Sequence, residues 1–170
     1  MAGLKDWFVR VDTDRSGTIE ISELQHVTFD RIPIGMEVAA KLVQVFDSDR
    51  NGKIDFVEYA SMHKFISHMR QAFLNADADK SGRIEAKEIF EALRGAGFNY
   101  LTLPTVQELL NKFDKSRRGL DWREFLMMVA HIAHVRSVFQ WNDTKKTGQI
   151  TLSSDQLTHI SAYLLDIKFQ

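Results

Sequence analysis

The stretch DTDRSGTIEISE, at residues 12–23, recurs with small changes as DSDRNGKIDFVE at residues 47–58 and as DADKSGRIEAKE at residues 77–88. Each copy is twelve residues long, with Asp at places 1 and 3, Ser or Asn at place 5 and Gly at place 6. Ile follows at place 8, an acidic residue at place 9 and Glu at place 12. Three copies in register are not expected by chance, so this pattern decides the fold and the chemistry of the chain.

The shared residue types suit a hard divalent cation and match the EF-hand calcium loop. Calcium takes six to eight oxygen ligands, which Asp, Ser, Asn and a bidentate Glu supply. Gly at place 6 permits the sharp turn that points the place 7 carbonyl inward, and place 7 tolerates varied side chains because it donates only backbone. The pattern predicts about three calcium sites, whose ligands are Asp12, Asp14, Ser16, Thr18 and Glu23 in the first loop, Asp47, Asp49, Asn51, Lys53 and Glu58 in the second, and Asp77, Asp79, Ser81, Arg83 and Glu88 in the third.

Two further copies of the repeat have lost part of the pattern. DKSRRGLDWRE, at residues 114–124, is one residue short after its glycine, and DTKKTGQITLSS, at residues 143–154, has Lys145 at place 3 and Ser154 in place of the closing Glu. The net charge of the loops rises from −3 through −2 and −1 to +1 and +1. Affinity in these loops depends partly on ligand charge. We therefore expect strong binding in the first two loops, weaker binding in the third and no calcium in the last two.

The spacing of the loops predicts an all-α fold in which neighbouring hands share helices. Loop starts are separated by 35, 30, 37 and 29 residues, and the two long gaps contain turn sequences, RIPIG at residues 31–35 and GAGFNYLTLP at residues 95–104. The short gaps, at residues 56–76 and 122–141, read as uninterrupted helices of about twenty residues, roughly 30 Å long. Each serves as the exit helix of one hand and the entry helix of the next. Hands 1 and 2 then pair, hands 3 and 4 pair, and hand 5 is left over.

These boundaries predict one domain over residues 1–170, with hands at about residues 4–30, 36–65, 66–95, 104–130 and 131–166. Hand 5 has no partner within the chain, so we expect it to pair with the same hand of a second chain in an isologous two-fold contact. The apolar residues at place 8 suit a short ladder between neighbouring loops; they are Ile19, Ile54, Ile84 and Ile150, with Leu120 in the shortened loop.

On these residues the chain resembles the penta-EF-hand family. The resemblance covers residues 4 to about 165 and rests on the fivefold repeat, the two shared helices, the degenerate fifth loop and the segment KFDKSRRGLDWREF at residues 112–125. It implies a calcium sensor that forms a homodimer or heterodimer through hand 5, presents an apolar groove to a target protein or peptide, and moves to membranes on binding calcium. The stretch HVTFDRIPIG at residues 26–35, taken as a helix, is most similar to protozoan members such as the amoebal granule proteins called grainins.

Two features depart from the family pattern. Family members usually carry a Gly/Pro-rich N-terminal extension, whereas this sequence starts almost at its first hand. The sequence AYLLDIKFQ, at residues 162–170, places Asp166 and Lys168 where an apolar tail that seals the dimer is expected.

The composition limits the other functions. Hydrophobic residues at 44% and charged residues at 26% are ordinary for a globular protein, and no run of eighteen apolar residues exists. The first residues lack an apolar signal core, so we expect a cytoplasmic protein that moves to membranes, vesicles or granules with calcium. We expect no enzyme, because the sequence has no cysteine, phosphate loop or nucleophile motif and its clustered carboxylates belong to the calcium loops. His131 and His134 lie one helical turn apart, but no third ligand for zinc is evident.

Calcium binding would reverse the charge of the chain. Three ions would take the formal charge from −1 to +5 (−1 + 6), which would favour anionic lipid or nucleic acid near the basic loop residues. Three interpretations remain open: a sensor or adaptor that exposes an apolar groove or membrane-binding surface, a buffer or storage protein that barely opens, and a calcium-controlled regulatory subunit or nucleic-acid-binding factor.

Overall fold

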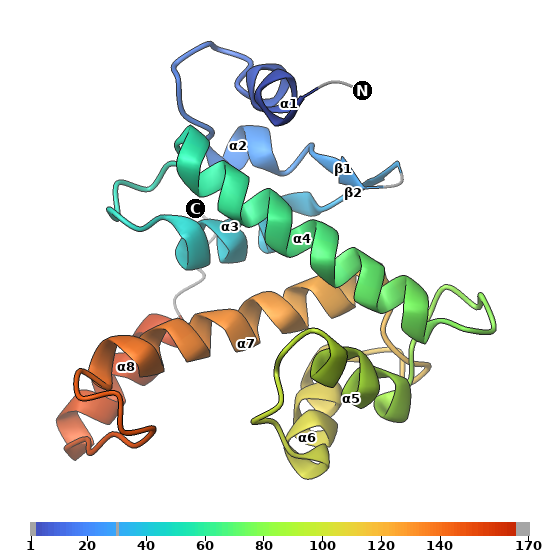
Figure 1. The fold of residues 1–170 in the computed structure, drawn as a ribbon, viewed down its shortest axis with the longest axis vertical. Coiled ribbons are helices and arrows are strands. Elements are labelled where there is room, and N and C mark those ends of the chain that lie inside the picture. The colour runs from blue at the N-terminus through green and yellow to red at the C-terminus, as the bar shows by residue number, and fades with distance from the viewer. Residues whose placement is uncertain (1–2, 30, 166–170) are drawn as a thin grey trace.

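A computed structural model describes residues 3–29 and 31–165, which form eight helices and a two-stranded hairpin (Figure 1). The predicted all-α fold is confirmed. In chain order the elements are α1 (Leu4–Val11), α2 (Ile21–Leu24), β1 (Thr28–Phe29), β2 (Ile32–Pro33), α3 (Gly35–Phe46), α4 (Phe56–Ala76), α5 (Ala86–Gly95), α6 (Leu103–Phe113), α7 (Trp122–Asn142) and α8 (Ser154–Leu165).

The two predicted shared helices are confirmed as α4 and α7, each of 21 residues. Figure 1 shows α4 running from hand 2 to hand 3 and α7 running from hand 4 to hand 5. Both helices begin with an aspartate cap. Asp55 accepts a hydrogen bond from the Glu58 N–H at 2.8 Å and Asp121 accepts one from the Glu124 N–H at 3.0 Å. Such caps satisfy amide groups that a helix start otherwise leaves without partners.

Loop pairing follows the predicted order. Ile19 and Ile54 form an antiparallel bridge between loops 1 and 2, and Ile84 and Leu120 form one between loops 3 and 4. All four side chains are fully buried. Within residues 3–29 and 31–165, Ile150 of loop 5 takes part in no bridge, so hand 5 is the unpaired hand of the chain.

The core lies where the paired hands meet. α3 and α4 both pack against α7, which brings hands 1–2 and hands 3–4 together. Phe73, Trp122 and Phe125 are buried at this junction, with their ring centroids 5.6 to 6.3 Å apart. This junction therefore ties the start of α7 to the end of α4.

The expected helix over residues 26–35 is wrong. The structure has a hairpin in this stretch, with Thr28 opposite Pro33 and Phe29 opposite Ile32. Pro33 has no N–H to continue a helical ladder, and Thr, Phe and Ile favour extended backbone. Arg31 has a φ of 67°, in the left-handed region that a helix interior does not use.

Parts of the predicted hands lie outside the described residues. They are residue 30 of hand 1 and residue 166 of hand 5, and the predicted role of Asp166 and Lys168 in the C-terminal tail also falls on residues that are not described. Among the helices of the described stretches, none has the length and apolar character needed to cross a bilayer.

Candidate metal-binding loops

The first two loops gather their carboxylates. Asp12, Asp14 and Glu23 each contribute an oxygen atom, and these three oxygens lie within 4.8 Å of one another. The same holds in loop 2 for Asp47, Asp49 and Glu58. The Ser16 hydroxyl lies 3.0 Å from the Thr18 carbonyl oxygen, so two further predicted ligands of loop 1 are adjacent. Oxygen atoms in this density fit calcium, a hard cation.

The place 1 aspartate shapes every loop. In all five, its carboxylate accepts a hydrogen bond from the N–H of the place 6 glycine. The donor–acceptor distances are 2.9 Å for Asp12 and Gly17, 2.7 Å for Asp47 and Gly52, 3.1 Å for Asp77 and Gly82, 2.8 Å for Asp114 and Gly119, and 2.7 Å for Asp143 and Gly148. The backbone N–H of Thr147 is the main cause that lowers the pKa of Asp143. This aspartate therefore organises the turn even in the loops that are expected to bind no calcium.

A left-handed basic residue occupies place 4 in all five loops. The φ angles lie between 52° and 59° for Arg15, Arg50, Lys80, Arg117 and Lys146. L-residues seldom adopt this conformation, so the turn holds each of them in a costly backbone state. Its recurrence shows that loops 4 and 5 keep the backbone path of the first three.

The closing glutamates of loops 1 and 2 are held inside their loops. Oε1 of Glu23 accepts hydrogen bonds from the N–H and the hydroxyl of Thr13, at 2.7 and 2.8 Å. Oε1 of Glu58 is bound in the same way by Ser48, at 2.7 Å from both groups. Partial burial raises the pKa of Glu23, but the bonds from Glu20 and Thr13 outweigh it and the net pKa is lowered. Both glutamates therefore have a carboxylate oxygen fixed inside the loop, where a cation would bind.

Loop 3 keeps the scaffold but not the closed glutamate. Ser81 donates its N–H to Asp79 at 3.0 Å and its hydroxyl to the Arg83 carbonyl at 2.9 Å, as in loop 1. Place 2 is Ala78, which has no hydroxyl to hold Glu88. Among the residues that the structure describes, the loop 3 carboxylates form no group comparable to those of loops 1 and 2.

Loops 4 and 5 lack part of the donor set. In loop 4 the guanidinium of Arg83 lies 3.3 Å from Oε2 of the closing Glu124. In loop 5 the closing place is Ser154, the first residue of α8, and Lys145 replaces the second aspartate. Neither loop forms a carboxylate group within the described stretches.

The two histidines of α7 belong to the core. His134 is fully buried, and its Nδ1 lies 3.0 Å from Nζ of the buried Lys41 on α3. The ring of His131 lies against Phe113, with centroids 5.7 Å apart. Burial and the nearby Lys41 lower the pKa of both histidines to about 4. A lysine at this distance from His134 disfavours a metal cation there.

The sequence reasoning missed two features of the site. The calcium-loop pattern assigns no role to place 2, although Thr13 and Ser48 bind the closing glutamate with their hydroxyl groups and Ala78 has none. It also treats place 7 as a backbone ligand only, whereas the Arg83 side chain reaches the next loop. The hydroxyl at place 2 is visible in the sequence. The contact of Arg83 with loop 4 depends on how loops 3 and 4 pair, which the sequence does not show.

Comparison with known proteins identifies the first four repeats as two EF-hand pairs. A family model described as an EF-hand domain pair matches residues 1–64 and again residues 66–130. The chain is 45% identical to Penta-EF hand domain-containing protein 2 of Dictyostelium discoideum over 159 residues, covering 94% of this chain and 77% of that protein. It is 30% identical to peflin of Danio rerio over 153 residues, but spans only 56% of the length of that protein.

A solved structure agrees with the sequence relatives. It is described as a homolog of programmed cell death 6 protein from Leishmania major Friedlin, is 33% identical, and superposes with a TM-score of 0.69 over 96% of this chain and 91% of that chain. Calcium-dependent protein kinase 34 of Arabidopsis thaliana is 32% identical over 135 residues, which is only 25% of the kinase. The resemblance to the kinase is thus limited to a minor part of its length.

Proposed function

This chain belongs to the penta-EF-hand family and is a calcium-binding EF-hand protein, and we propose that it is a sensor whose second loop controls a pocket shared with hand 5. We propose calcium sites in loops 1, 2 and 3, with the first two filling before the third. The closed glutamates of the first two loops and the more acidic charge of those loops support this order.

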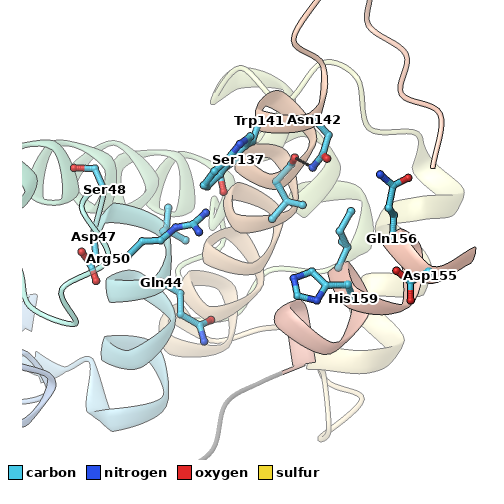
Figure 2. A pocket seen from close by; sticks show the side chains of 13 residues that line it. Gln44, Asp47, Ser48, Arg50, Ser137, Trp141, Asn142, Asp155, Gln156 and His159 are labelled. Carbon is cyan, nitrogen blue, oxygen red and sulfur yellow. Dashed lines mark hydrogen bonds between the residues drawn. The ribbon is translucent and has the colours of Figure 1, made fainter. Parts of the chain in front are cut away.

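The observation that carries the sensor proposal is a pocket between loop 2 and hand 5. It has a volume of about 540 Å³ and is lined on one side by Asp47, Ser48 and Arg50. The other side is formed by the end of α7 and by α8, including Trp141 and His159, and Figure 2 shows the two sets of side chains across the cavity. Asp47 and Ser48 belong at once to this pocket and to the calcium loop, so calcium and a pocket ligand would act on the same backbone.

A cation–π contact links loop 2 to hand 5. The guanidinium carbon of Arg50 lies 3.8 Å from the ring centroid of Trp141, within the range in which the ring attracts a cation. Arg50 sits between two predicted ligands, Asp49 and Asn51, in a left-handed conformation. A change in the backbone of loop 2 therefore moves the guanidinium relative to hand 5.

The closing Glu58 gives calcium a way to move α4. Its two oxygens are now bound to Ser48 and to the N–H of Asp55, the latter at 3.0 Å. Bidentate coordination would draw this carboxylate toward the ion, and the first turn of α4 would follow it. Because α4 continues into hand 3, the displacement would reach the third loop as well.

The partners follow as part of the proposal. We propose dimers through hand 5, in keeping with the exposed Trp141 and Leu157 on α7 and α8. A calcium-loaded surface would bind a target protein or a membrane, with the charge change from −1 to +5 (−1 + 6) favouring anionic lipid. A cytoplasmic location with calcium-dependent movement to membranes or granules stays a prediction, and so does the lack of catalysis by this chain.

Tryptophan fluorescence tests the sensor mechanism. Calcium titration should change the emission of Trp141, so the change should be much smaller in Trp141→Phe and in Glu58→Gln. Glu23→Gln is the matched control, because it removes the closing glutamate of loop 1 and leaves loop 2 intact. An equal calcium response in Trp141→Phe and in the unmodified chain would show that loop 2 does not act on hand 5.

One observation favours a buffer instead. The oxygens of loops 1 and 2 are already gathered, so calcium could bind with little opening of the hands. A dye that reports apolar surface separates the two functions: a sensor gives a calcium-dependent rise in dye fluorescence and a buffer gives none.

A further inference from the structure

The side chain of Arg83 crosses from loop 3 into loop 4. Its Nη1 and Nη2 atoms both lie 3.3 Å from Oε2 of Glu124, and Nη2 also lies 3.3 Å from Oγ of Ser116. Asp121 is more distant, with Oδ2 at 3.9 Å from Nη1. Arg83 and Glu124 are mostly shielded, with 24% and 27% of their side chains exposed.

The groups that Arg83 contacts are those that would face a cation in loop 4. Ser116 holds place 3 and Glu124 is the closing residue, which in loop 1 correspond to Asp14 and Glu23. In loop 1 these two carboxylates lie in one group with Asp12. In loop 4 a hydroxyl replaces one carboxylate and the loop carries a net charge of +1, which is a poor donor set for calcium. A guanidinium carries a single charge and directional donors, and it matches one carboxylate and one hydroxyl.

The backbone of the paired loops brings Arg83 to this place. Ile84 and Leu120 exchange two hydrogen bonds, both at 2.9 Å, immediately next to Arg83. An added Cβ on Gly119 would lie 2.8 Å from the Ile84 carbonyl oxygen, so the two loops approach closely and glycine is required there. Asp114 accepts hydrogen bonds from the Gly119 N–H and the Ser116 hydroxyl, at 2.8 and 2.9 Å, so the Ser116 oxygen is left to accept from Arg83.

We propose that loop 4 is a cation site that the chain fills with its own Arg83 guanidinium, so that hand 4 keeps its fold with no metal ion. The contact has a counterpart that serves as a contrast. Lys53 holds the same place in loop 2, but its ammonium group bonds Glu20 at 2.9 Å, at the surface, with 44% and 46% of the two side chains exposed. Glu23, the closing residue of loop 1, is bound by Thr13 and not by Lys53.

Hydrogen exchange on the calcium-free full chain tests the first half of the proposal. In Arg83→Met, the amides of residues 114–124 should exchange about tenfold faster than in the unmodified chain, because a charge-assisted contact is lost. Lys53→Met is the matched control, since it removes the same charge at the same loop place and should leave residues 114–124 unchanged. Equal exchange of this segment in Arg83→Met and the unmodified chain would overturn the proposal.

Chemical rescue tests whether the contact is a site and not an ordinary surface ion pair. Arg83→Ala leaves space for a small ligand, so millimolar methylguanidinium should restore the protection of residues 114–124 in this variant. The same addition should have no effect on the double variant Arg83→Ala with Glu124→Gln. If methylguanidinium restores no protection in Arg83→Ala, or restores it equally in the double variant, loop 4 is not a guanidinium site.

Discussion

In loops 1 and 2, the residue at place 2 holds the closing glutamate with two hydrogen bonds. The N–H and hydroxyl of Thr13 or Ser48 bind one carboxylate oxygen of Glu23 or Glu58, whereas Ala78 offers no hydroxyl to Glu88. A hydrogen bond to a charged group contributes about 1.5 to 3 kcal/mol, which is the size of effect that orders neighbouring sites. The side-chain hydroxyl at place 2, present in Ser48 and absent from Ala78, is therefore one cause of the expected difference in calcium affinity between loops 2 and 3.

Removing the place 2 hydroxyl from loop 2 should weaken its calcium binding, and adding one to loop 3 should strengthen it. We expect Ser48→Ala to weaken binding in loop 2 and Ala78→Ser to strengthen it in loop 3, each by about fivefold to tenfold, since 1.4 kcal/mol is a factor of ten. Isothermal titration calorimetry measures both. Ser61→Ala is the control, because its hydroxyl bonds only a carbonyl of its own helix. If Ala78→Ser binds no more tightly than the unmodified chain, place 2 has no role in affinity.

Removal of a closing carboxylate should remove one site. Glu23→Gln and Glu58→Gln should each lower the calcium stoichiometry by one, because a neutral amide cannot replace a bidentate carboxylate. Asp143→Asn should leave the stoichiometry unchanged while it weakens the bond to Gly148 and loosens loop 5. Calorimetry at saturating calcium gives the count, and an unchanged count in Glu58→Gln would refute the assignment of loop 2.

The residues that follow from chemistry alone could be predicted, and those that follow from pairing could not. The twelve-residue pattern predicted Asp12, Asp47 and their closing glutamates from what calcium requires, and the structure brings these carboxylates together. The side chain of Arg83 reaches Glu124 only because loops 3 and 4 lie in one bridge. The pairing of β1 with β2 was not predicted, because strands of two residues are too short to leave an alternating pattern in the sequence.

At the scale of the element, the residue at place 9 determines how firmly a helix starts. Asp55 and Asp121 both cap the first turn of a long helix, at N–H···O distances of 2.8 and 3.0 Å. Glu85 holds the same place before α5, and its side chain makes no capping bond.

We expect Asp55→Ala to lower the free energy of unfolding by about 1 kcal/mol, the usual effect of losing an N-cap. Asp55→Asn should keep most of the stability, because the amide oxygen can still accept the bond. Glu85→Ala should have little effect and is the matched control. Urea unfolding of the calcium-free chain measures all three, and an equal loss in Glu85→Ala would show that the effect is not capping.

At the scale of the whole molecule, we expect the contact between α3 and α7 to weaken in acid. The charged and titratable groups around the two histidines are Lys41 on α3 and Lys112 on α6. Both histidines have a pKa of about 4 in the folded chain, below the ordinary value of 6.5. The unfolded chain therefore binds more protons below pH 6.5, so stability is fully present above that pH and falls as the pH drops toward 4.

Calcium-free unfolding should show this loss between pH 7 and pH 5. Each unit by which the pKa is lowered corresponds to about 1.4 kcal/mol, and the fully buried His134 should contribute most. We expect His134→Gln to reduce the pH dependence of the melting temperature, although it also changes the stability at pH 7. His26→Gln, at an exposed position, is the control. A pH dependence that is identical in His134→Gln and the unmodified chain would contradict the assignment.

Hand 5 should determine the oligomeric state. Leu157 is 58% exposed on α8, next to a loop whose Ile150 has no bridge within the described residues. We expect Leu157→Glu to convert dimers to monomers, and deletion of residues 153–170 to do the same. Val57→Glu, at a 71% exposed position on α4, is the control that should leave the dimer intact. Sedimentation velocity gives the result, and a dimer that persists in Leu157→Glu would place the interface elsewhere.

The helices α4 and α7 divide the chain differently from the loop bridges. Hands 2 and 3 share the helix α4, and hands 4 and 5 share α7. The loop bridges instead join hand 1 to hand 2 and hand 3 to hand 4. Shared helices and loop bridges therefore alternate along the chain, so each hand is joined to the next by one or the other. No fragment of whole hands can be excised without cutting a helix or orphaning a loop. Because the number of hands is odd, hand 5 has no loop to bridge to among the described residues. Its unpaired loop is the part of the chain that can pair with a second molecule.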